Sequence, residues 1–431
     1  MELYEITEYE EILSKRNYKE DVMLSVWCVT YNHGKYIKEA LEGFVSQKTN
    51  FRYKVVIFDD ASTDNSQEII KEYAKMYPEL FHVFLLKKNI HAHPQRRIAV
   101  NNLRKRVLTG KYVAFCEGDD FWTDSGKIQL QVEYMENNPS CILTVHDGIC
   151  LDCVKNERRR MIGEDEERDL SAGEIIGKKK GLIPTASMVI RKEYAILEDF
   201  FGECTSSDWT MQIKAFLSGE VHYFGKCMCC YRYMHKDSWT SEIRISKEKM
   251  FLQCVEIDSF LSRLDEYSKY RYNKYIIEMK QQYVNIALNN FSEDMIEYIK
   301  NIAVKKDGIK RQRYASDLLE QVRRRTDRMY FPQEIKEELL NYKNIWVMGT
   351  GHYSKIISSQ LKNNGIQIKG YLVSSGQSKD GMNGEVYYAS EITEAKNEIF
   401  VLIAIDPIIY GEIQEELEKN EIYNYGCTLL I

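Results

Sequence analysis

Apolar segments alternate with amphipathic ones through the first part of the chain, and this alternation limits the possible folds more than any other feature. The segments Met23–Val29, Tyr53–Phe58 and Phe81–Leu86 are short and rich in β-branched or aromatic residues, as buried strands are. Between them, apolar residues recur at helical spacing over 36–45, and a second amphipathic helix follows Asp64 and runs through Tyr77. Strands and helices in this order predict an α/β fold, with a mostly parallel sheet covered by helices on both faces.

Polar residues follow each predicted strand. Thr30-Tyr31-Asn32 come after the first strand and Asp59-Asp60 after the second. Because parallel strands end at one edge of a sheet, we expect these side chains to meet in one crevice. There, Tyr31 is suited to stack on a base, and Asp59 or Asp60 to accept hydrogen bonds from a base or ribose.

Three carboxylates follow a fourth apolar run, Gly110–Phe115. They are Glu117, Asp119 and Asp120. Hard oxygen ligands suit Mg²⁺ or Mn²⁺, which normally share their coordination sphere with substrate phosphates. A solvated acidic turn is the simpler interpretation of the triplet alone, but its position after a strand favours a cation site.

Composition restricts the classes of function. The chain has 431 residues, 44% of them hydrophobic, which predicts two or three folded domains. Its net charge of −6 argues against a general nucleic-acid binder. The acidic start has no signal-peptide pattern, so we expect a cytoplasmic protein with reduced cysteines. Cys150 and Cys153 have zinc-knuckle spacing, as an alternative to the favoured role of core residues.

Three motifs in order carry a resemblance to a known family. They are Val29-Thr30-Tyr31-Asn32, Asp59-Asp60-Ala61-Ser62-Thr63-Asp64 and Glu117-Gly118-Asp119-Asp120-Phe121-Trp122. With these motifs, residues 22–240 resemble the family 2 glycosyltransferases of GT-A fold. The resemblance implies a nucleotide-diphospho-sugar donor, most often UDP-linked, and Mn²⁺ or Mg²⁺ as cofactor. Two departures are Val29 in place of a proline and Glu117 in place of the first aspartate of the DxD motif.

The resemblance also implies roles for single residues. Metal ligands would be Glu117, Asp119, Asp120 and His235, and the donor would contact Thr30, Tyr31, Asn32, Asp59, Asp60, Asp119 and Arg232. Arg97 is a further candidate for a phosphate or base contact. Asp208 opens a predicted helix and is suited to cap it, but the family pattern places the general base there.

The function that these features imply is inverting, metal-dependent transfer of a sugar to a hydroxyl of a surface glycan or its lipid-linked precursor. One alternative is a nucleotidyltransferase or pyrophosphorylase, which shares a metal-diphosphate site. Another is a nucleotide-sensing scaffold that acts through the C-terminal part. Peripheral association with the inner face of a membrane through the basic stretch Lys310–Arg328, and a homo-oligomer, are left open.

Four parts are expected along the chain: a leader helix over 1–21, the GT-A domain over 22–240, a helical region over 241–335 and a Rossmann-like domain over 336–431. In the last part, a strand at Asn344–Met348 runs into Gly349-Thr350-Gly351, close to the dinucleotide-binding turn. Ser354 replaces its third glycine, and the second strand ends without an acidic residue. A Rossmann-like fold is therefore predicted without NAD binding.

Overall fold

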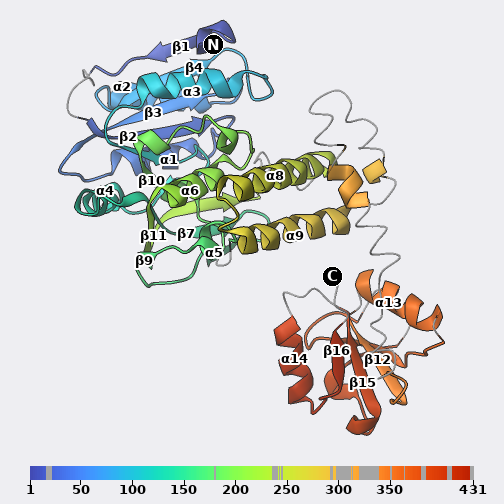
Figure 1. Cartoon of the computed structure of the whole chain (residues 1–431). Helices are drawn as coiled ribbons and strands as arrows, with labels where there is room; N and C mark the ends of the chain where they lie inside the picture. The colour runs from blue at the N-terminus through green and yellow to red at the C-terminus, as the bar shows by residue number, and fades with distance from the viewer. Residues whose placement is uncertain are drawn as a thin grey trace. The chain divides into compact units, whose positions relative to one another are not determined.

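The structure is a computed structural model that describes residues 1–15, 22–178, 181–234, 246–291, 339–349, 352–363, 365–379, 385–404 and 410–427, with positions 241, 243, 295–297, 312 and 314–319 besides. The chain divides into two compact units, Met1–Phe291 and Ser292–Ile431 (Figure 1). The first unit includes helices α8 (Lys247–Tyr267) and α9 (Asn273–Asn290), which the sequence assigned to a separate helical region. The four predicted boundaries remain a prediction.

A large mixed sheet forms the centre of the first unit. Its strands are, in spatial order, β1 (Tyr9–Ile12), β4 (Phe81–Leu86), β3 (Arg52–Asp59), β2 (Val22–Thr30), β5 (Tyr112–Phe115), β10 (Val189–Arg191), β7 (Cys141–Asp152), β11 (Glu220–Tyr233) and β6 (Phe121–Trp122). Two short strands extend it: β8 (Glu157–Arg160) pairs with β7, and β9 (Arg168–Asp169) pairs with β11. Strands β4, β3, β2 and β5 pair in parallel, and so do β7 and β11.

Antiparallel β10 joins the two parallel groups, because it pairs with β5 on one side and β7 on the other. Strands β5 and β7 therefore run in the same direction, and the carboxyl ends of β2, β3, β5, β7 and β11 share one edge of the sheet. The prediction of an α/β fold with a mostly parallel sheet is confirmed.

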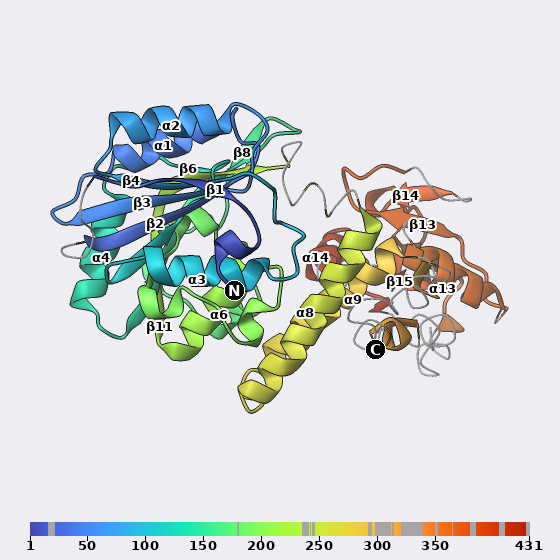
Figure 2. The same cartoon turned by 90° about the horizontal axis from the view of Figure 1, so that it is seen from above.

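Helices cover both faces of this sheet, as Figure 2 shows. One face packs against α1 (Ile37–Val45), α2 (Ser66–Met76) and α4 (Lys127–Asn137). The other face packs against α3 (Arg96–Val107), α5 (Ala172–Ile175), α6 (Ser207–Ser218), α8 and α9. Apolar residues at helical spacing explain this arrangement: on α1, Ile37, Ala40, Leu41 and Phe44 are all buried.

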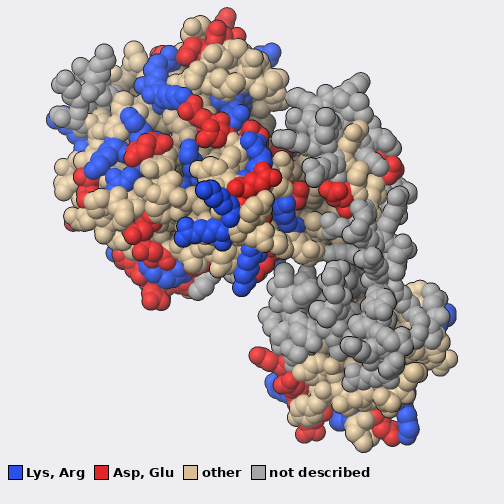
Figure 3. All heavy atoms as spheres, viewed as in Figure 1, with Lys and Arg blue, Asp and Glu red and all other residues tan. Residues whose placement is uncertain are grey.

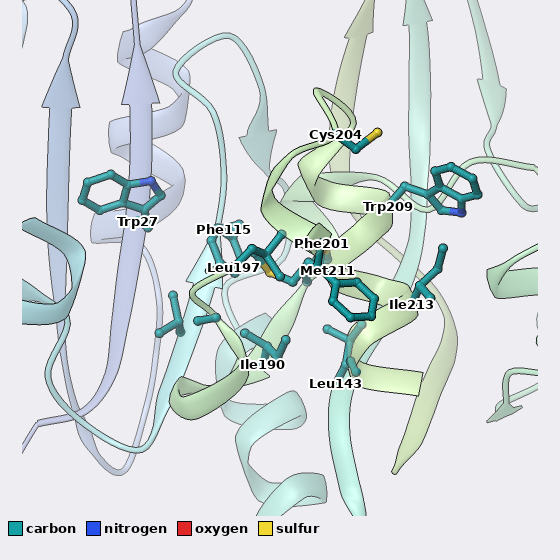
Figure 4. Packing of buried hydrophobic residues seen from close by; sticks show 14 of the residues in the cluster. Trp27, Phe115, Leu143, Ile190, Leu197, Phe201, Cys204, Trp209, Met211 and Ile213 are labelled. Carbon is teal, nitrogen blue, oxygen red and sulfur yellow. The ribbon is translucent and has the colours of Figure 1, made fainter. Parts of the chain in front are cut away.

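Strands that are covered on both faces read as continuous apolar runs, and β2 is buried along most of its length. Figure 4 shows part of the core on one face, where Trp27, Phe115 and Leu143 of the sheet lie in the same layer as Met211 and Ile213 of α6. Packing of this kind holds the strand ends rigidly, which fixes the loops that follow them.

The predicted leader helix over 1–21 is wrong for the residues that the structure describes. Leu3–Glu5 form a single 3-10 turn, and Tyr9–Ile12 form β1, which pairs antiparallel with β4. The glutamates of this segment favour a helix locally, but an exposed sheet edge offers backbone hydrogen bonds along a whole strand. Tertiary pairing therefore overrides local propensity here.

The second unit contains a parallel sheet in the order β14 (Val386–Tyr388), β13 (Gly370–Val373), β12 (Asn344–Met348), β15 (Ile399–Ile403) and β16 (Tyr425–Cys427). Helices α13 (His352–Asn363) and α14 (Tyr410–Lys419) accompany it. The strand order is that of doubly wound sheets, which confirms the Rossmann-like fold. Ser354, at the third glycine position, is buried, and its hydroxyl donates to the Ala404 carbonyl over 3.4 Å.

On the face of the first unit seen in Figure 3, basic and acidic side chains are interspersed. Among the residues that the structure describes, no helix has the length and apolar character needed to cross a membrane. The basic stretch Lys310–Arg328 lies outside the described residues except for 312 and 314–319.

Candidate functional site

The loops after β2, β3 and β5 meet at the carboxyl edge of the first sheet. Thr30 and Asp59 are paired residues at the ends of their strands, and the Asp60 N–H donates to the Thr30 carbonyl over 3.0 Å. The Gly118 N–H donates to the Val29 carbonyl over 2.9 Å, so the acidic loop continues alongside β2. The structure thus brings together three of the predicted groups of site residues.

The turn after β3 is organised by the carboxylate of Asp59. It accepts hydrogen bonds from the Ser62 N–H over 3.0 Å, from the Ser62 hydroxyl and from the Gln67 amide over 2.6 Å. Ala61 has a φ of 63°, so the turn passes through the left-handed region. Burial is the main cause that raises the pKa of Asp59. Asp59 therefore shapes the turn, and its predicted contact with a donor remains a prediction.

Asp60 also points into the protein. Its side chain is almost completely buried, and one carboxylate oxygen accepts from the Ile90 N–H over 2.8 Å. The other lies 3.7 Å from the Nε of Arg96. Asp60 thereby joins the turn after β3 to the segment that leads into α3.

The loop after β2 is tied to the same turn. Asn32 has a φ of 55°; its N–H donates to the Ser62 hydroxyl over 2.8 Å, and its side-chain oxygen accepts from the Thr63 N–H over 2.8 Å. Thr30 is buried, whereas 43% of the Tyr31 surface is exposed. The Tyr31 ring is thus presented to solvent at the predicted stacking position.

The acidic loop crowds three carboxylates around Gly118. Burial raises the pKa of Glu117 to about 8, helped by the charges of Asp119 and Asp208. The pKa of buried Asp120 is raised well above its usual value by burial and then by the charges of Asp119 and Glu117. Gly118 cannot carry a side chain without movement, because a Cβ there would stand 2.7 Å from the Thr30 hydroxyl oxygen. The loop is therefore tightly packed, and burial and mutual repulsion make its carboxyl groups harder to ionise than exposed ones.

Arg232, near the end of β11, holds the acidic loop from the other side. Its N–H donates to an Asp120 carboxylate oxygen over 2.9 Å, and its guanidinium donates to the Asp119 carbonyl and, over 2.5 Å, to Glu39. The guanidinium lies 4.8 Å from the ring centroid of Tyr36. These contacts show Arg232 as a link between α1, the acidic loop and β11, and its predicted contact with a donor remains a prediction.

Asp208 lies in the first turn of α6, where its charge suits the positive end of the helix. It is near enough to the acidic loop for its charge to raise the pKa of Glu117. The ammonium of Lys178 lies 4.0 Å from the Trp209 ring centroid, and the Asp208 charge partly offsets the lowering of the Lys178 pKa by burial. Asp208, on α6, therefore lies near the same acidic loop as Glu117.

One predicted residue, Arg97, is not part of this assembly. Arg97 donates from its guanidinium to the carbonyls of Glu198 and Asp199, over 3.3 and 3.4 Å. His235 lies outside the described residues. Sequence reasoning missed His33, whose Nε2 stands 3.7 Å from an Asp119 carboxylate oxygen. Its position between Asn32 and Gly34, in a loop already assigned to the site, was the available signal.

A divalent cation, which the family resemblance implies, fits the chemistry of the acidic loop. The raised pKa values of Glu117 and Asp120 arise partly from neighbouring carboxylates, and a bound cation would relieve that repulsion. Within the described part of the chain, no three His, Cys, Asp or Glu side chains are already arranged to hold a metal. Further ligands would then come from the substrate and water. The same observation gives no support to zinc at Cys150 and Cys153, of which Cys150 is buried and Cys153 exposed.

The part of the chain that contains the loops after β2, β3 and β5 is similar to known proteins. Residues 25–196 match the family described as Glycosyl transferase family 2. The Mycobacterium tuberculosis protein Rv1520 is 34% identical over 220 residues, which cover 51% of this chain and 61% of that protein. The putative teichuronic acid biosynthesis glycosyltransferase TuaG of Bacillus subtilis is 31% identical over 137 residues, 30% of this chain and 51% of that protein.

Among solved structures, S. aureus TarS 1-349 in complex with UDP-GlcNAc is similar with a TM-score of 0.42 and 17% identity, over 75% of this chain and 93% of that one. The chain thus spans about three fifths of the length of the mycobacterial relatives and about half of TuaG.

Proposed function

We propose that this chain, whose residues 25–196 match the model of glycosyl transferase family 2, transfers one sugar from a nucleotide-diphospho-sugar to a hydroxyl acceptor with inversion. The observation that carries the proposal is the crowding of Glu117, Asp119 and Asp120 at the carboxyl edge of the sheet, opposite Asp208. Such an edge is where parallel α/β sheets bind their ligands.

The donor would lie across the loops after β2, β3 and β5. The exposed ring of Tyr31 is available to stack on the base, most often uracil in this family. The backbone on both sides of Tyr31 is fixed, because the Thr30 carbonyl accepts from the Asp60 N–H and the Asn32 N–H donates to the Ser62 hydroxyl. The sugar and its diphosphate would then extend toward the acidic loop.

Asp208 would act as the general base. A carboxylate there would accept the proton of the acceptor hydroxyl as its oxygen attacks the anomeric carbon from the face opposite the diphosphate. The bond from the anomeric carbon to the diphosphate oxygen breaks as the new glycosidic bond forms, so inversion follows and no covalent enzyme intermediate is required. Glu117, Asp119 and Asp120 would hold Mn²⁺ or Mg²⁺, which when bound stabilises the negative charge on the leaving diphosphate.

The acceptor would be a surface glycan or its lipid-linked precursor. This part of the proposal is supported by the similarity to TuaG, a putative glycosyltransferase of teichuronic acid biosynthesis. Contact with a membrane surface would bring the protein to a lipid-linked acceptor.

The test is thermal stabilisation of the purified chain by a panel of nucleotide-sugars and NAD(H), each with and without Mn²⁺, because a ligand of the native state raises the melting temperature. We expect a shift with one UDP-sugar that requires Mn²⁺ and is lost in Asp119→Ala. The control Glu72→Ala, an exposed carboxylate on α2, should keep the shift. A shift with NAD(H) alone would refute the proposal.

A further inference from the structure

The loop between β2 and α1 is fixed by more contacts than a simple connection needs. In addition to the hydrogen bonds of Asn32, the Gly34 N–H donates to an Asp64 carboxylate oxygen over 2.8 Å. A Cβ at Gly34 would stand 1.9 Å from the Asn65 side-chain oxygen, so the two loops touch. His33 lies between Asn32 and Gly34 in the sequence, so hydrogen bonds hold the backbone on both sides of it.

The His33 backbone also begins α1. Its carbonyl accepts from the N–H groups of Tyr36 and Ile37, each over 2.7 Å. The imidazole approaches the acidic loop, because its Nε2 lies 3.7 Å from an Asp119 carboxylate oxygen. Both side chains keep some access to solvent, with exposed fractions of 12% for His33 and 18% for Asp119.

That separation suits two ligands of one cation. Two atoms that each lie about 2.1 Å from an ion stand at most about 4.2 Å apart, and nearer when the angle at the ion is smaller than 180°. The observed 3.7 Å is inside this range. It is longer than a direct hydrogen bond between the two atoms, and an ion that binds both would lie to one side of the line that joins them.

On the basis of the proposed function, we propose that His33 is a nitrogen ligand of the divalent cation and joins Asp119 in holding it against the donor diphosphate. The remaining positions would be filled by diphosphate oxygens, water and the other carboxylates of the loop. An imidazole ligand changes the preference among metals, because carboxylates and water suit Mg²⁺ whereas imidazole favours the later transition metals. His33 would thus make the site prefer Mn²⁺ or Co²⁺ to Mg²⁺.

The direct test is pulsed electron paramagnetic resonance of Mn²⁺ bound to the full chain with UDP. A coordinated imidazole couples its ¹⁴N nucleus to the metal electrons and modulates the spin echo. We expect this modulation in the wild-type protein, its loss in His33→Ala, and its retention in the control His91→Ala, an exposed histidine of another loop. Melting temperatures of the three proteins without metal should agree, which would show that the variants are folded.

Calorimetry supplies a second readout of the same site. In His33→Ala, the Kd for Mn²⁺ in the presence of UDP should rise by at least roughly ten-fold, because removing a side chain that supports a metal site commonly weakens metal binding by that factor. The Kd for Mg²⁺ should rise less, so the ratio of the two constants falls. Asp119→Ala should raise the Kd for both ions.

The outcomes separate this inference from the function on which it rests. Mn²⁺-dependent binding of a UDP-sugar without nitrogen modulation would overturn the role of His33 and leave the transferase proposal standing. Modulation that persists in His33→Ala would assign the nitrogen to another residue and also overturn it. Failure of the wild-type protein to bind Mn²⁺ with UDP would overturn both.

Discussion

Replacing Lys127 by methionine should stabilise the first unit near neutral pH. Lys127 begins α4 and is fully buried; its Nζ donates to the Gln131 side-chain oxygen over 2.8 Å and lies 4.3 Å from the Trp122 ring centroid. Burial lowers the pKa of Lys127 from its ordinary 10.5 to about 7. Methionine has a similar length and no charge, so it should fill the same space.

The size of the effect follows from the pKa. At about 1.36 kcal/mol for each pH unit, a fall from 10.5 to about 7 corresponds to about 5 kcal/mol of destabilisation at pH 7. Losing the bond to Gln131 and the contact with Trp122 offsets about 3 kcal/mol of this. We therefore expect Lys127→Met to raise the free energy of unfolding by about 2 kcal/mol at pH 7.

The sign of the pH dependence is fixed by linkage. Because the folded pKa is the lower one, the unfolded chain binds more protons between about pH 7 and the ordinary pKa of 10.5. Wild-type stability therefore contains a contribution that rises with pH over this window, and Lys127→Met lacks it. The advantage of the variant should shrink by about 1.4 kcal/mol for each pH unit and vanish near about pH 8.5.

Urea unfolding between about pH 7 and about pH 8.5, followed by tryptophan fluorescence, measures both effects. A Trp346→Phe background in both proteins leaves tryptophans only in the first unit. The control Lys75→Met replaces an exposed lysine on α2 and should change stability by less than about 0.5 kcal/mol at every pH. A difference between Lys127→Met and wild type that stays constant with pH would refute the reasoning.

Substitutions at three further positions test the site. Asp208→Asn should lower turnover, measured as release of nucleoside diphosphate, by roughly 10² to 10⁴ with an unchanged melting temperature; near-normal turnover would exclude Asp208 as the base. Gly118→Ala should cost about 1–3 kcal/mol in urea unfolding, since the new methyl meets the Thr30 hydroxyl, and an unchanged midpoint would show that the loop is loosely held. Asp59→Ala should cost about 2 kcal/mol and accelerate hydrogen exchange of the Ser62 amide, whereas Asp59→Asn should cost less; equal costs would contradict the role of the carboxylate.

The convergence of the site could be predicted from sequence because it depends on a rule of topology. Parallel strands end at one edge, so Thr30, Asp59 and the loop at Glu117 had to meet once the strands were identified. The direction of each side chain follows no such rule. Asp59 turns inward because Ser62 and Gln67 can donate to it, and only the folded turn shows that.

Partners that are distant in sequence were the least predictable. The resemblance placed Arg232 near the donor, but its contacts with Glu39 and the Asp119 carbonyl depend on the pairing of β11 with β6 and on the position of α1. The strand at Tyr9–Ile12 is likewise set by the free edge of β4. His33 was overlooked because a single histidine in a loop has no sequence pattern that marks it as a ligand. Only its distance from Asp119 in the folded protein indicates a role at the site.

The hydrogen bond from Arg232 to Asp120 also sets an order of events during synthesis. The two residues are 112 positions apart, so the acidic loop leaves the ribosome long before its partner on β11 has been made. The parallel strands β2, β3 and β5 are complete by then and can pair, while the carboxylates that follow them still lack this donor. The first parallel strands can therefore pair early, and this edge of the sheet is closed only when β11, the last long strand, emerges.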